Sequence, residues 1–509
     1  MSFARVFSAQ PGIPKGKLVH VETDVSRGLH AFSIVGLPDK AVEEARDRIS
    51  SAIKHTDKKF TPPKSTNKKI VISLAPATIK KEGAVFDLPM AISYLIAAGE
   101  IQCDVEKVLF AGELSLDGKL RPIRGALSIA QVARDEDFDT LIIPHENAEE
   151  AALINDITVY GAGSLTDVIA HLKPGKSVPL KKAERADRSK NTYDGVNFDD
   201  IRGQEHAKRA LEIAAAGAHN VALWGPPGTG KTMLARALRS ILPPLSQDAT
   251  IEVTTIHSYA GVTDGGVITE PPFRSPHHTT SYAALIGGGT TPRPGEVTLA
   301  HRGILFLDEF PEFHRDCVQA LREPLEDKVV SVSRAKGSQV FPANFVLVAA
   351  LNPCPCGRFG TARCECPPLA VERYKRKISG PIADRIDMWI MVGEMPLEAL
   401  AARTERTTRE TDALRERVLR ARSMQSARFN GHERLETNSD MGSRDIESAA
   451  RITKDAEESL RSAARSMNLS PRGYHRTVKL ARTIADLMES AAIEPVHVLE
   501  ALQYRERGW

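Results

Sequence analysis

Hydrophobic and polar residues follow two different rhythms along the first 171 residues of the chain. Short runs rich in β-branched residues predict strands over residues 18–25, 31–37, 68–75, 108–116 and 139–145. Residues 39–53 and 88–99 instead repeat their apolar positions every three to four residues, which predicts helices. Strands that alternate with helices in this way predict one α/β domain over residues 1–171.

The rhythm then changes three times. Residues 172–197 are polar and rich in lysine, which predicts a linker, although contact with a polyanion stays open. Residues 198–394 predict a second α/β unit, because the apolar runs 304–307 and 345–352 are typical of strands in a parallel sheet covered on both faces. Residues 395–509 are rich in Arg, Ala, Leu and Glu and predict an α-helical lid.

A glycine-rich segment lies between the apolar run 221–224 and a helical run that begins MLARAL. It fits the nucleotide-binding P-loop at Gly225, Pro226, Pro227, Gly228, Thr229, Gly230, Lys231 and Thr232. Backbone N–H groups and the positive end of the helix dipole attract phosphates there. Lys231 is expected to reach the β- and γ-phosphates, and Thr232 to offer its hydroxyl to Mg²⁺. The chain is therefore expected to bind a nucleoside triphosphate.

Polar residues end the two later apolar strands of this unit. Asp308 is expected to hold Mg²⁺ through its waters, and Glu309 to polarise the attacking water. Asn352 is expected to orient that water or to sense the γ-phosphate. A helix N-cap remains the alternative for the acidic pair, and a plain turn for Asn352 before Pro353.

Further segments are more specific than a P-loop. They read FSIVGLPDKAVEEAR, LAPATIKKEGAVFDLPMA, GELSLDGKLRPIRG, FRSPHHTTSYAALIGGG, PGEVTLAHRGILFLDE, NPCPCG and RGYHRTVKLARTIADL. In this order, and over essentially the whole length, the chain resembles the magnesium-chelatase-like branch of the AAA+ ATPases known as the YifB/ComM family. The resemblance implies ATP as the nucleotide, hydrolysis with Mg²⁺, and a homo-oligomer, most simply a hexameric ring.

The same resemblance implies further site residues. Ile201 and Gly203 are similar to the segment that wraps the adenine. Arg385 matches an arginine finger that reaches the nucleotide of the adjoining subunit, and Arg472 matches a second sensor that acts on its own subunit's nucleotide. The alternatives are an ion pair of Arg385 with its flanking aspartates, and an exposed lid charge for Arg472.

Residues 70 to 170 resemble the proteolytic domain of Lon, which uses a Ser-Lys dyad. Val85 stands at the nucleophile's place and Leu127 at the lysine's place, so peptidase chemistry is expected to be lost; Ser128 and Lys119 lack an evident pairing. A scaffold or a DNA platform remains. The basic positions that such a platform could use, or that a solvated surface would also explain, are Lys80, Lys81, Lys119, Arg121 and Arg124.

Four cysteines crowd into a short segment, as Cys354, Cys356, Cys364 and Cys366. Four thiolates suit a tetrahedral structural Zn²⁺, and four reduced cysteines remain the alternative. His277 and His278 have no acidic residue nearby in the sequence and are assigned to a mobile insertion loop. Tyr282 in that loop suits stacking on a single strand, and Arg293 and His301 could join it.

Composition limits the remaining function classes. Sixty-eight basic and 65 acidic residues give a formal charge of +3, so any basic surface is local. No signal peptide or apolar span is recognised, and a cytoplasmic protein is expected. The family resemblance implies a DNA helicase that drives branch migration during recombination or natural transformation. A magnesium-chelatase ATPase subunit and a protein-remodelling chaperone remain alternatives.

Overall fold

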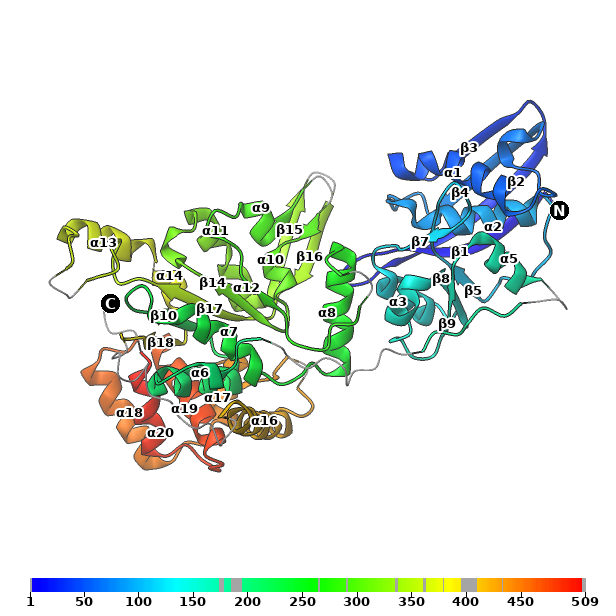
Figure 1. Cartoon of the computed structure of the whole chain (residues 1–509). Helices are drawn as coiled ribbons and strands as arrows, with labels where there is room; N and C mark the ends of the chain where they lie inside the picture. Colours follow the sequence, from blue (N-terminus) through cyan, green and yellow to red (C-terminus); the bar gives the residue numbers. More distant parts are fainter. Residues whose placement is uncertain are drawn as a thin grey trace. The chain divides into compact units, whose positions relative to one another are not determined.

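The computed structural model describes residues 2–173, 178–184, 195–263, 266–289, 292–334, 337–359, 363–378, 380–394, 410–432 and 434–505. The chain forms two compact units (Figure 1). The first consists of Met1–Lys190 and Ser246–Thr269, and the second of Asn191–Leu245 and Glu270–Trp509. None of the described helices has the length and apolar character needed to cross a bilayer.

A mixed seven-stranded sheet organises the first unit, in the order β3-β4-β2-β1-β5-β8-β9. Its strands are β1 (Phe3–Gln10), β2 (Lys17–Arg27), β3 (Ala31–Val35), β4 (Lys68–Ala75), β5 (Val108–Phe110), β8 (Thr140–Pro144) and β9 (Thr158–Ala162). Strand β2 runs antiparallel to both β1 and β4, and the other neighbours are parallel. The predicted α/β class is confirmed, but β1 and β9 were not predicted.

Helices of the first unit bury an apolar face against this sheet. Helix α1 (Lys40–Thr56) begins where the Asp39 side chain accepts a 2.8 Å bond from Val42 N–H, an N-cap that satisfies one free donor of the first turn. Helix α2 (Asp87–Ala97) is buried almost all round and packs on β1 and β2. The remaining elements are β6 (Glu113–Leu114), β7 (Leu120–Arg121), α3 (Ala126–Asp135), α4 (His145–Ala151) and α5 (Leu165–Leu172).

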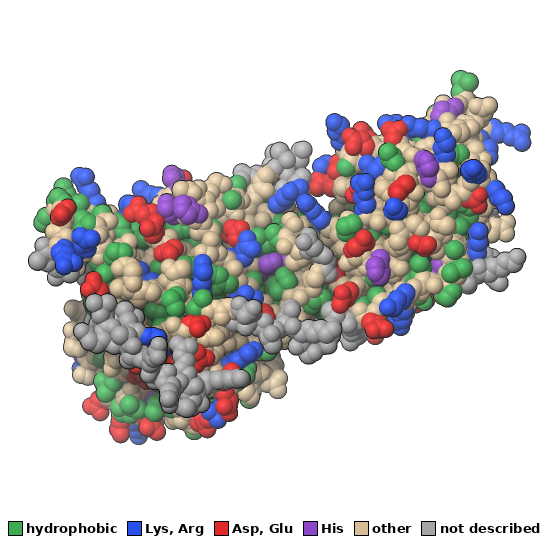
Figure 2. All heavy atoms as spheres, in the orientation of Figure 1, with side chains coloured by type: hydrophobic (Ala, Val, Ile, Leu, Met, Phe, Trp, Pro, Cys, Tyr) green, Lys and Arg blue, Asp and Glu red, His purple; other side chains and the backbone are tan. Residues whose placement is uncertain are grey.

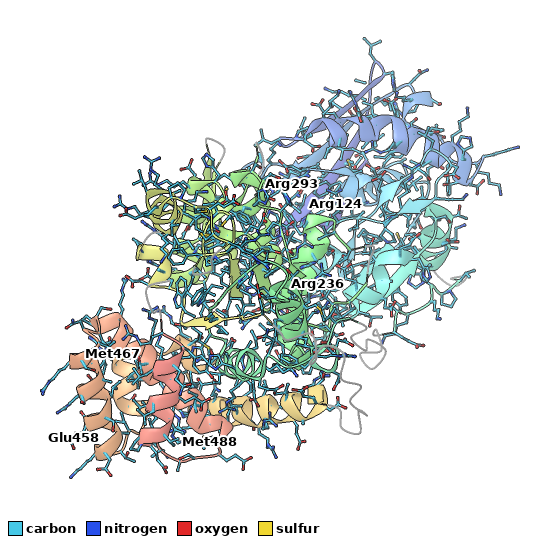
Figure 3. All side chains as sticks on the ribbon, turned by 60° about the vertical axis from the view of Figure 1, so that its left-hand side comes forward. Arg124, Arg236, Arg293, Glu458, Met467 and Met488 are labelled. Atoms are coloured by element: carbon cyan, nitrogen blue, oxygen red, sulfur yellow. The ribbon has the colours of Figure 1, made fainter. Side chains whose placement is uncertain are left out.

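One helix of the first unit comes from the middle of the chain. Helix α8 (Gln247–Ala260) packs against α3, and the backbone N–H of Gly125 donates a 3.1 Å bond to Ser258 Oγ. Gly261, with φ of +71°, ends this helix so close to Arg124 that a Cβ would lie 2.6 Å from the arginine Nε. Figure 3 labels Arg124. This segment lies within the predicted 198–394 unit, whereas the structure packs it into the first unit.

A parallel five-stranded sheet organises the second unit, in the order β11-β14-β17-β10-β18. Its strands are β10 (Val221–Trp224), β11 (Phe273–Arg274), β14 (Ile304–Leu307), β17 (Val346–Leu351) and β18 (Met388–Met391). Their apolar side chains share one core with α6 (Glu205–Gly217) and α7 (Lys231–Ile241). The predicted parallel sheet is confirmed, and the carboxyl ends of β10, β14 and β17 meet at one edge.

The second unit also contains shorter helices and strands. They are α9 (Tyr282–Ile286), β12 (Gly287–Gly288), β13 (Arg293–Pro294), α10 (Glu296–Leu299), α11 (Arg315–Ala320), α12 (Arg322–Asp327), the hairpin β15 (Val329–Arg334) with β16 (Gly337–Pro342), α13 (Pro368–Lys377) and α14 (Gly380–Ala383).

The end of the chain is helical, as predicted. Its helices are α16 (Glu410–Arg428), α17 (Ser443–Ala449), α18 (Lys454–Ser466), α19 (Pro471–Leu487) and α20 (Pro495–Gln503). Helices α16 and α19 pack on α6, so this helical group shares the core of the second unit's sheet. Met467 and Met488 remain half exposed on this helical group (Figure 3). The first part of the predicted lid, residues 395–409, lies outside the described residues.

Candidate nucleotide-binding site

The loop after β10 has the backbone geometry that a phosphate cradle needs. Gly225 lies so close to β18 that a Cβ would be 2.1 Å from the carbonyl oxygen of Val392. Gly228 and Gly230 have φ of +80° and +88°, and no described atom lies within 4 Å of the place where their Cβ atoms would stand. Helix α7 starts after Gly230 with no side-chain cap among the described residues. Its first N–H groups therefore point into open space, where an anion would bind.

Four predicted residues converge below this loop. Lys231 Nζ donates to the carbonyls of Gly225 and Pro226 at 2.7 and 2.8 Å and to Asn352 Oδ1 at 3.2 Å. Thr232 Oγ1 donates to Asp308 Oδ2 at 3.0 Å. These bonds connect the carboxyl ends of three neighbouring strands.

Electrostatics and chemistry of these groups suit a nucleotide with its metal. Burial lowers the pKa of Lys231, and the charge of Asp308 acts in the opposite direction. Oxygen ligands from a hydroxyl and a carboxylate are the kind that Mg²⁺ prefers. The open glycine cradle, the ammonium group and the oxygen pair together fit a triphosphate with Mg²⁺.

Glu309 follows Asp308 with an unusual backbone and an unexpected partner. Its φ is +50°, and its N–H donates to Asp308 Oδ1 at 2.9 Å. Its Oε2 lies 3.2 Å from Nδ1 of His278. The expectation that neither adjacent histidine has an acidic partner is therefore wrong for His278. No local signal links the two residues, which meet because β11 pairs with β14.

The segment expected near adenine lies between η4 (Phe198–Asp200) and α6. Ile201 is buried, and Gly203 has φ of +57°. The 3₁₀-helix η4 packs against α7. Gln204 Nε2 also donates to the carbonyl of Gly393 at 2.8 Å, just beyond β18.

Arg385 and Arg472 lie together, in a pocket of about 500 Å³ that none of residues 225–232 lines. Both contact Glu326, Arg385 through a direct ion pair and Arg472 through an Nη2–Oε1 separation of 3.6 Å. The side chain of Arg472 is 59% exposed. The alternative pairing of Arg385 with its flanking aspartates is not seen, because Glu326 takes that place. Arg472 thus lies on the same surface as Arg385. The expectation that Arg472 acts on its own subunit's nucleotide, while Arg385 acts on the adjoining subunit's, did not predict this shared position.

One of the aspartates that flank Arg385 has partners within the fold. Asp387 accepts a 3.0 Å bond from the Asn220 backbone and lies 3.5 Å from His219 Nδ1. Burial alone would raise the pKa of Asp387, but the bond with His219 and nearby cations lower it below the usual range.

No Ser-Lys dyad forms among the described residues of the first unit. Val85 and Leu127 are buried apolar side chains. Ser128 Oγ donates to the carbonyl of Gly12 at 2.9 Å and accepts from its N–H at 3.1 Å. Lys119 pairs instead with Asp117 at 3.3 Å.

Three of the basic residues proposed for a DNA platform already have partners in the protein. Lys81 is fully buried and donates to the carbonyl of Pro76, and burial lowers its pKa, so its place on a DNA platform is wrong. Lys80 pairs with Glu82, and Arg121 lies 3.5 Å from Glu113. On the face drawn in Figure 2, Lys and Arg side chains are interspersed with Asp and Glu.

The insertion segment keeps two of its three candidate strand-binding residues on the surface. Tyr282 is 46% exposed at the start of α9, and Arg293 is exposed in β13. His301 is buried, and its Nδ1 accepts a 3.0 Å bond from the Asn344 N–H, so its expected place in this loop is wrong.

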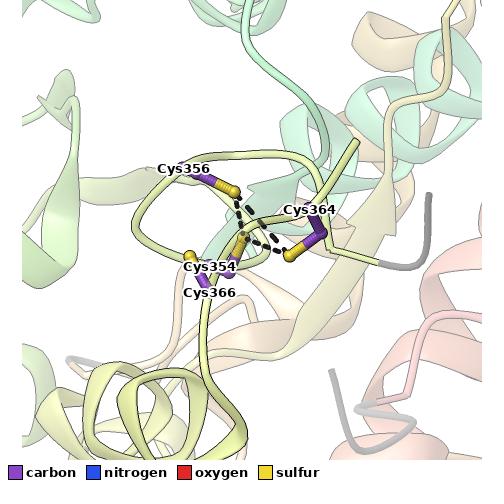
Figure 4. Close-up of side chains that lie close together, drawn as sticks. All are labelled: Cys354, Cys356, Cys364 and Cys366. Atoms are coloured by element: carbon purple, nitrogen blue, oxygen red, sulfur yellow. Dashed lines mark hydrogen bonds between the residues drawn. The ribbon is translucent and has the colours of Figure 1, made fainter. Parts of the chain in front are cut away.

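Four cysteines after β17 meet as the sequence spacing suggested. The sulfur atoms of Cys354, Cys356, Cys364 and Cys366 all lie within 4.8 Å of one another, and all four are free thiols (Figure 4). This cluster has the number and type of ligands that could hold one metal ion.

Comparison with known families covers most of the chain. Residues 197–400 match the profile described as magnesium chelatase, subunit ChlI. Residues 21–147 match the one described as subunit ChlI of Mg-chelatase, and residues 408–505 match the ChlI C-terminal profile.

Individual relatives agree with these profiles. The chain is 40% identical to a protein named competence protein ComM from Haemophilus influenzae, over 99% of this chain and 98% of that protein. It is 38% identical to YifB of Escherichia coli K12, over 96% of this chain and 94% of that protein. Lon protease 2 of Bacillus subtilis is 33% identical over 28% of this chain and 27% of its own length.

Proposed function

This chain belongs to the YifB/ComM family of magnesium-chelatase-like AAA+ ATPases, and from that premise we propose that it is a ring-forming ATP-hydrolysing motor that drives branch migration of DNA recombination intermediates. The observation that carries the ATPase proposal is the pair of bonds from Lys231 to Asn352 and from Thr232 to Asp308. They bring four of the polar groups that the reaction needs to one edge of a parallel sheet.

Residues of the chain divide the chemistry between them. When ATP binds, the Lys231 ammonium group exchanges its hydrogen bonds to the loop carbonyls for bonds to the β- and γ-phosphates. The first N–H groups of α7 bind the remaining phosphate charge. Thr232 and Asp308 would hold Mg²⁺, which would neutralise charge that develops on the phosphates. Glu309 accepts a proton from the attacking water, and Asn352 orients that water. Ile201 and Gly203 contact the adenine.

Two arginines complete the site from a neighbouring subunit in this proposal. Arg385 and Arg472 share the anion Glu326 and one pocket, so a single surface can present both to the γ-phosphate of the next protomer. In any closed ring every protomer both receives and supplies such arginines, and the proposed ring is a hexamer because the family resemblance implies one. An isolated protomer is then nearly inactive.

DNA as the polymer that is moved rests on the named relative and on the insertion segment. The Haemophilus influenzae relative is named a competence protein, and the family resemblance implies DNA as the substrate. In this chain, exposed Tyr282 supplies a stacking surface and exposed Arg293 a cation, the two groups that hold a single strand.

A second candidate is a chelatase-type motor that energises metal insertion. Its specific support is that all three matching profiles carry the name of a magnesium-chelatase subunit. The molecule that stimulates ATPase activity separates the candidates. Branched DNA would indicate the DNA motor, a chelatase partner the metal-insertion motor, and unfolded protein a remodelling chaperone.

The decisive experiment follows a labelled Holliday junction. The wild-type protein with ATP is expected to move the branch point, whereas Lys231→Ala is expected to bind no nucleotide and to move nothing. ATPase activity that branched DNA leaves unchanged, together with a stationary junction, would refute the DNA proposal.

A further inference from the structure

The sulfur atoms of four cysteines after β17 form one close group. Cys354 Sγ lies 3.3 Å from Cys356 Sγ and 3.9 Å from Cys364 Sγ. Cys356 and Cys364 are 3.7 Å apart, and Cys366 Sγ completes the group (Figure 4). Cys354 is fully buried, so the group has an interior side as well as a surface side.

These separations match one ion at the centre of a tetrahedron. A zinc–sulfur bond of about 2.3 Å places the sulfur corners about 3.8 Å apart. An iron–sulfur cluster divides its four cysteines between two or four irons, which sets the sulfurs on different irons further apart. We propose that Cys354, Cys356, Cys364 and Cys366 bind one Zn²⁺ in a closed structural site. Four protein ligands leave the ion no open position for a substrate or an activated water.

The position of this site gives the ion a definite task. Asn352 stands two residues before Cys354, and its side chain accepts the 3.2 Å bond from Lys231. Gly357, inside the cysteine loop, has φ of +76° and lies so close to the P-loop that a Cβ would be 2.7 Å from Cδ of Pro227. The loop that the ion closes therefore packs directly on the phosphate cradle.

Helix α13 extends the same arrangement. It begins just after Cys366. The phenol oxygen of its buried Tyr374 forms a hydrogen bond with the backbone of Asn352. Zn²⁺ thus ties the end of β17 to the start of α13 and holds Asn352 between the helix and the P-loop. Asn352 is the group that the ion positions, and the cysteines themselves touch no nucleotide.

Metal content tests the site without reference to activity. Full-length protein purified without a metal-binding tag is expected to contain about one zinc per chain by mass spectrometry of the elements. Cys364→Ser and Cys366→Ser are expected to lose most of it, whereas Cys103→Ser, a free cysteine of the first unit, keeps it. Less than about 0.2 zinc per wild-type chain, iron in its place, or full zinc retention in both cysteine variants would overturn the proposal.

Variants that fail to fold do not end the test. A mercurial added to wild-type protein is expected to release one zinc, measured with a coloured chelator, as four thiolates are titrated. Cobalt(II) exchanged into the protein is expected to show the strong visible bands of a tetrahedral thiolate site. Zinc release without thiolate titration, or cobalt bands typical of oxygen and nitrogen ligands, contradicts a four-cysteine site.

The positioning role rests on the proposed ATPase activity. Zinc release is expected to lower kcat about 10- to 100-fold, because misplacement of a positioning group by about 1 Å has effects of that size. ATP affinity stays within about threefold, since the P-loop N–H groups remain. Wild-type protein with one zinc but no ATPase activity would refute the proposed function and leave the metal site standing. Active protein without zinc would do the reverse.

Discussion

Single residues at the nucleotide site already have protein partners that a nucleotide would replace. Lys231 is held by two carbonyls of its own loop and by Asn352, and Thr232 is held by Asp308. Buried polar groups need such partners, because an unsatisfied one costs about 1–3 kcal/mol. A nucleotide that binds at this site would therefore exchange these bonds for bonds to its own phosphates.

Glu309→Gln tests the assignment of the general base. The amide cannot accept the proton of water, so kcat is expected to fall about 10²- to 10⁴-fold while ATP remains bound and stabilises the ring. Steady-state hydrolysis and retention of labelled ATP on size-exclusion chromatography measure the two effects. Unchanged turnover would remove Glu309 from the mechanism.

His278→Ala tests the contact that sequence analysis missed. His278 holds the Glu309 carboxylate at 3.2 Å, and loss of that contact frees the carboxylate for water. An exposed pair contributes up to about 1 kcal/mol, so basal kcat is expected to rise by up to about fivefold with no change in ATP affinity.

His277→Ala is the matched control for this change. Its Nδ1 lies 2.8 Å from Thr279 Oγ1 rather than against Glu309. Equal rates for both variants would mean that the contact with Glu309 has no influence on turnover.

At the scale of elements, segments distant in sequence complete one another's cores. Helix α8 follows α7 in the sequence but packs with α3 of the first unit. Helices α16 and α19, near the end of the chain, pack on α6 of the second unit. Apolar faces account for this exchange, because a lone helix or a small sheet cannot bury its own apolar stripe.

Asp440→Asn tests how the lid is held to the sheet unit. Asp440 accepts bonds of 2.9 and 2.8 Å from the N–H groups of Glu436 and Thr437 and pairs with Lys328. Loss of the buried charge is expected to cost about 1–3 kcal/mol of unfolding free energy at neutral pH. Urea unfolding followed by tryptophan fluorescence measures it, since Trp224 and Trp389 lie in this unit's sheet.

Acidic pH supplies the control for this variant. Burial alone would raise the pKa of Asp440, but Lys328 and the backbone donors lower it below its usual range. A lowered folded-state pKa stabilises the protein above the unfolded pKa of about 3.9 and loses that effect as pH falls through the folded value. The difference between Asp440→Asn and wild type should therefore shrink as pH falls below about 4. A pH-independent difference would contradict a charge effect.

At the scale of the whole molecule, the arginine pocket predicts shared active sites. Arg385→Ala and Arg472→Ala are both expected to spare ATP binding and to lower kcat, Arg385→Ala by about 10³- to 10⁵-fold. Mixing either variant with Glu309→Gln should restore part of the activity, because some interfaces then pair an intact Glu309 with an intact arginine. ATP turnover across mixing ratios measures this recovery.

The mixing experiment also separates the two possible roles of Arg472. Action on its own subunit's nucleotide leaves every Arg472→Ala subunit inactive, so mixing would restore nothing. Full-speed turnover by a monomer would contradict the ring altogether.

Local patterns account for the parts of the fold that were predicted. Strand β4 and helix α1 follow from contiguous periodicity, and the P-loop follows from its fixed glycine spacing. Strand β18 was missed because four apolar residues between loops carry too short a period to recognise.

The sequence by itself determined the α/β class, the P-loop, the parallel arrangement of the second sheet and the cysteine spacing, because each is encoded within a short run of residues. Only the tertiary structure decided that His278 meets Glu309, that Arg472 lies with Arg385 beside Glu326, and that α8 packs in the first unit. Those pairings join distant positions through packing of whole elements, and packing depends on the complete set of apolar faces rather than on any local pattern.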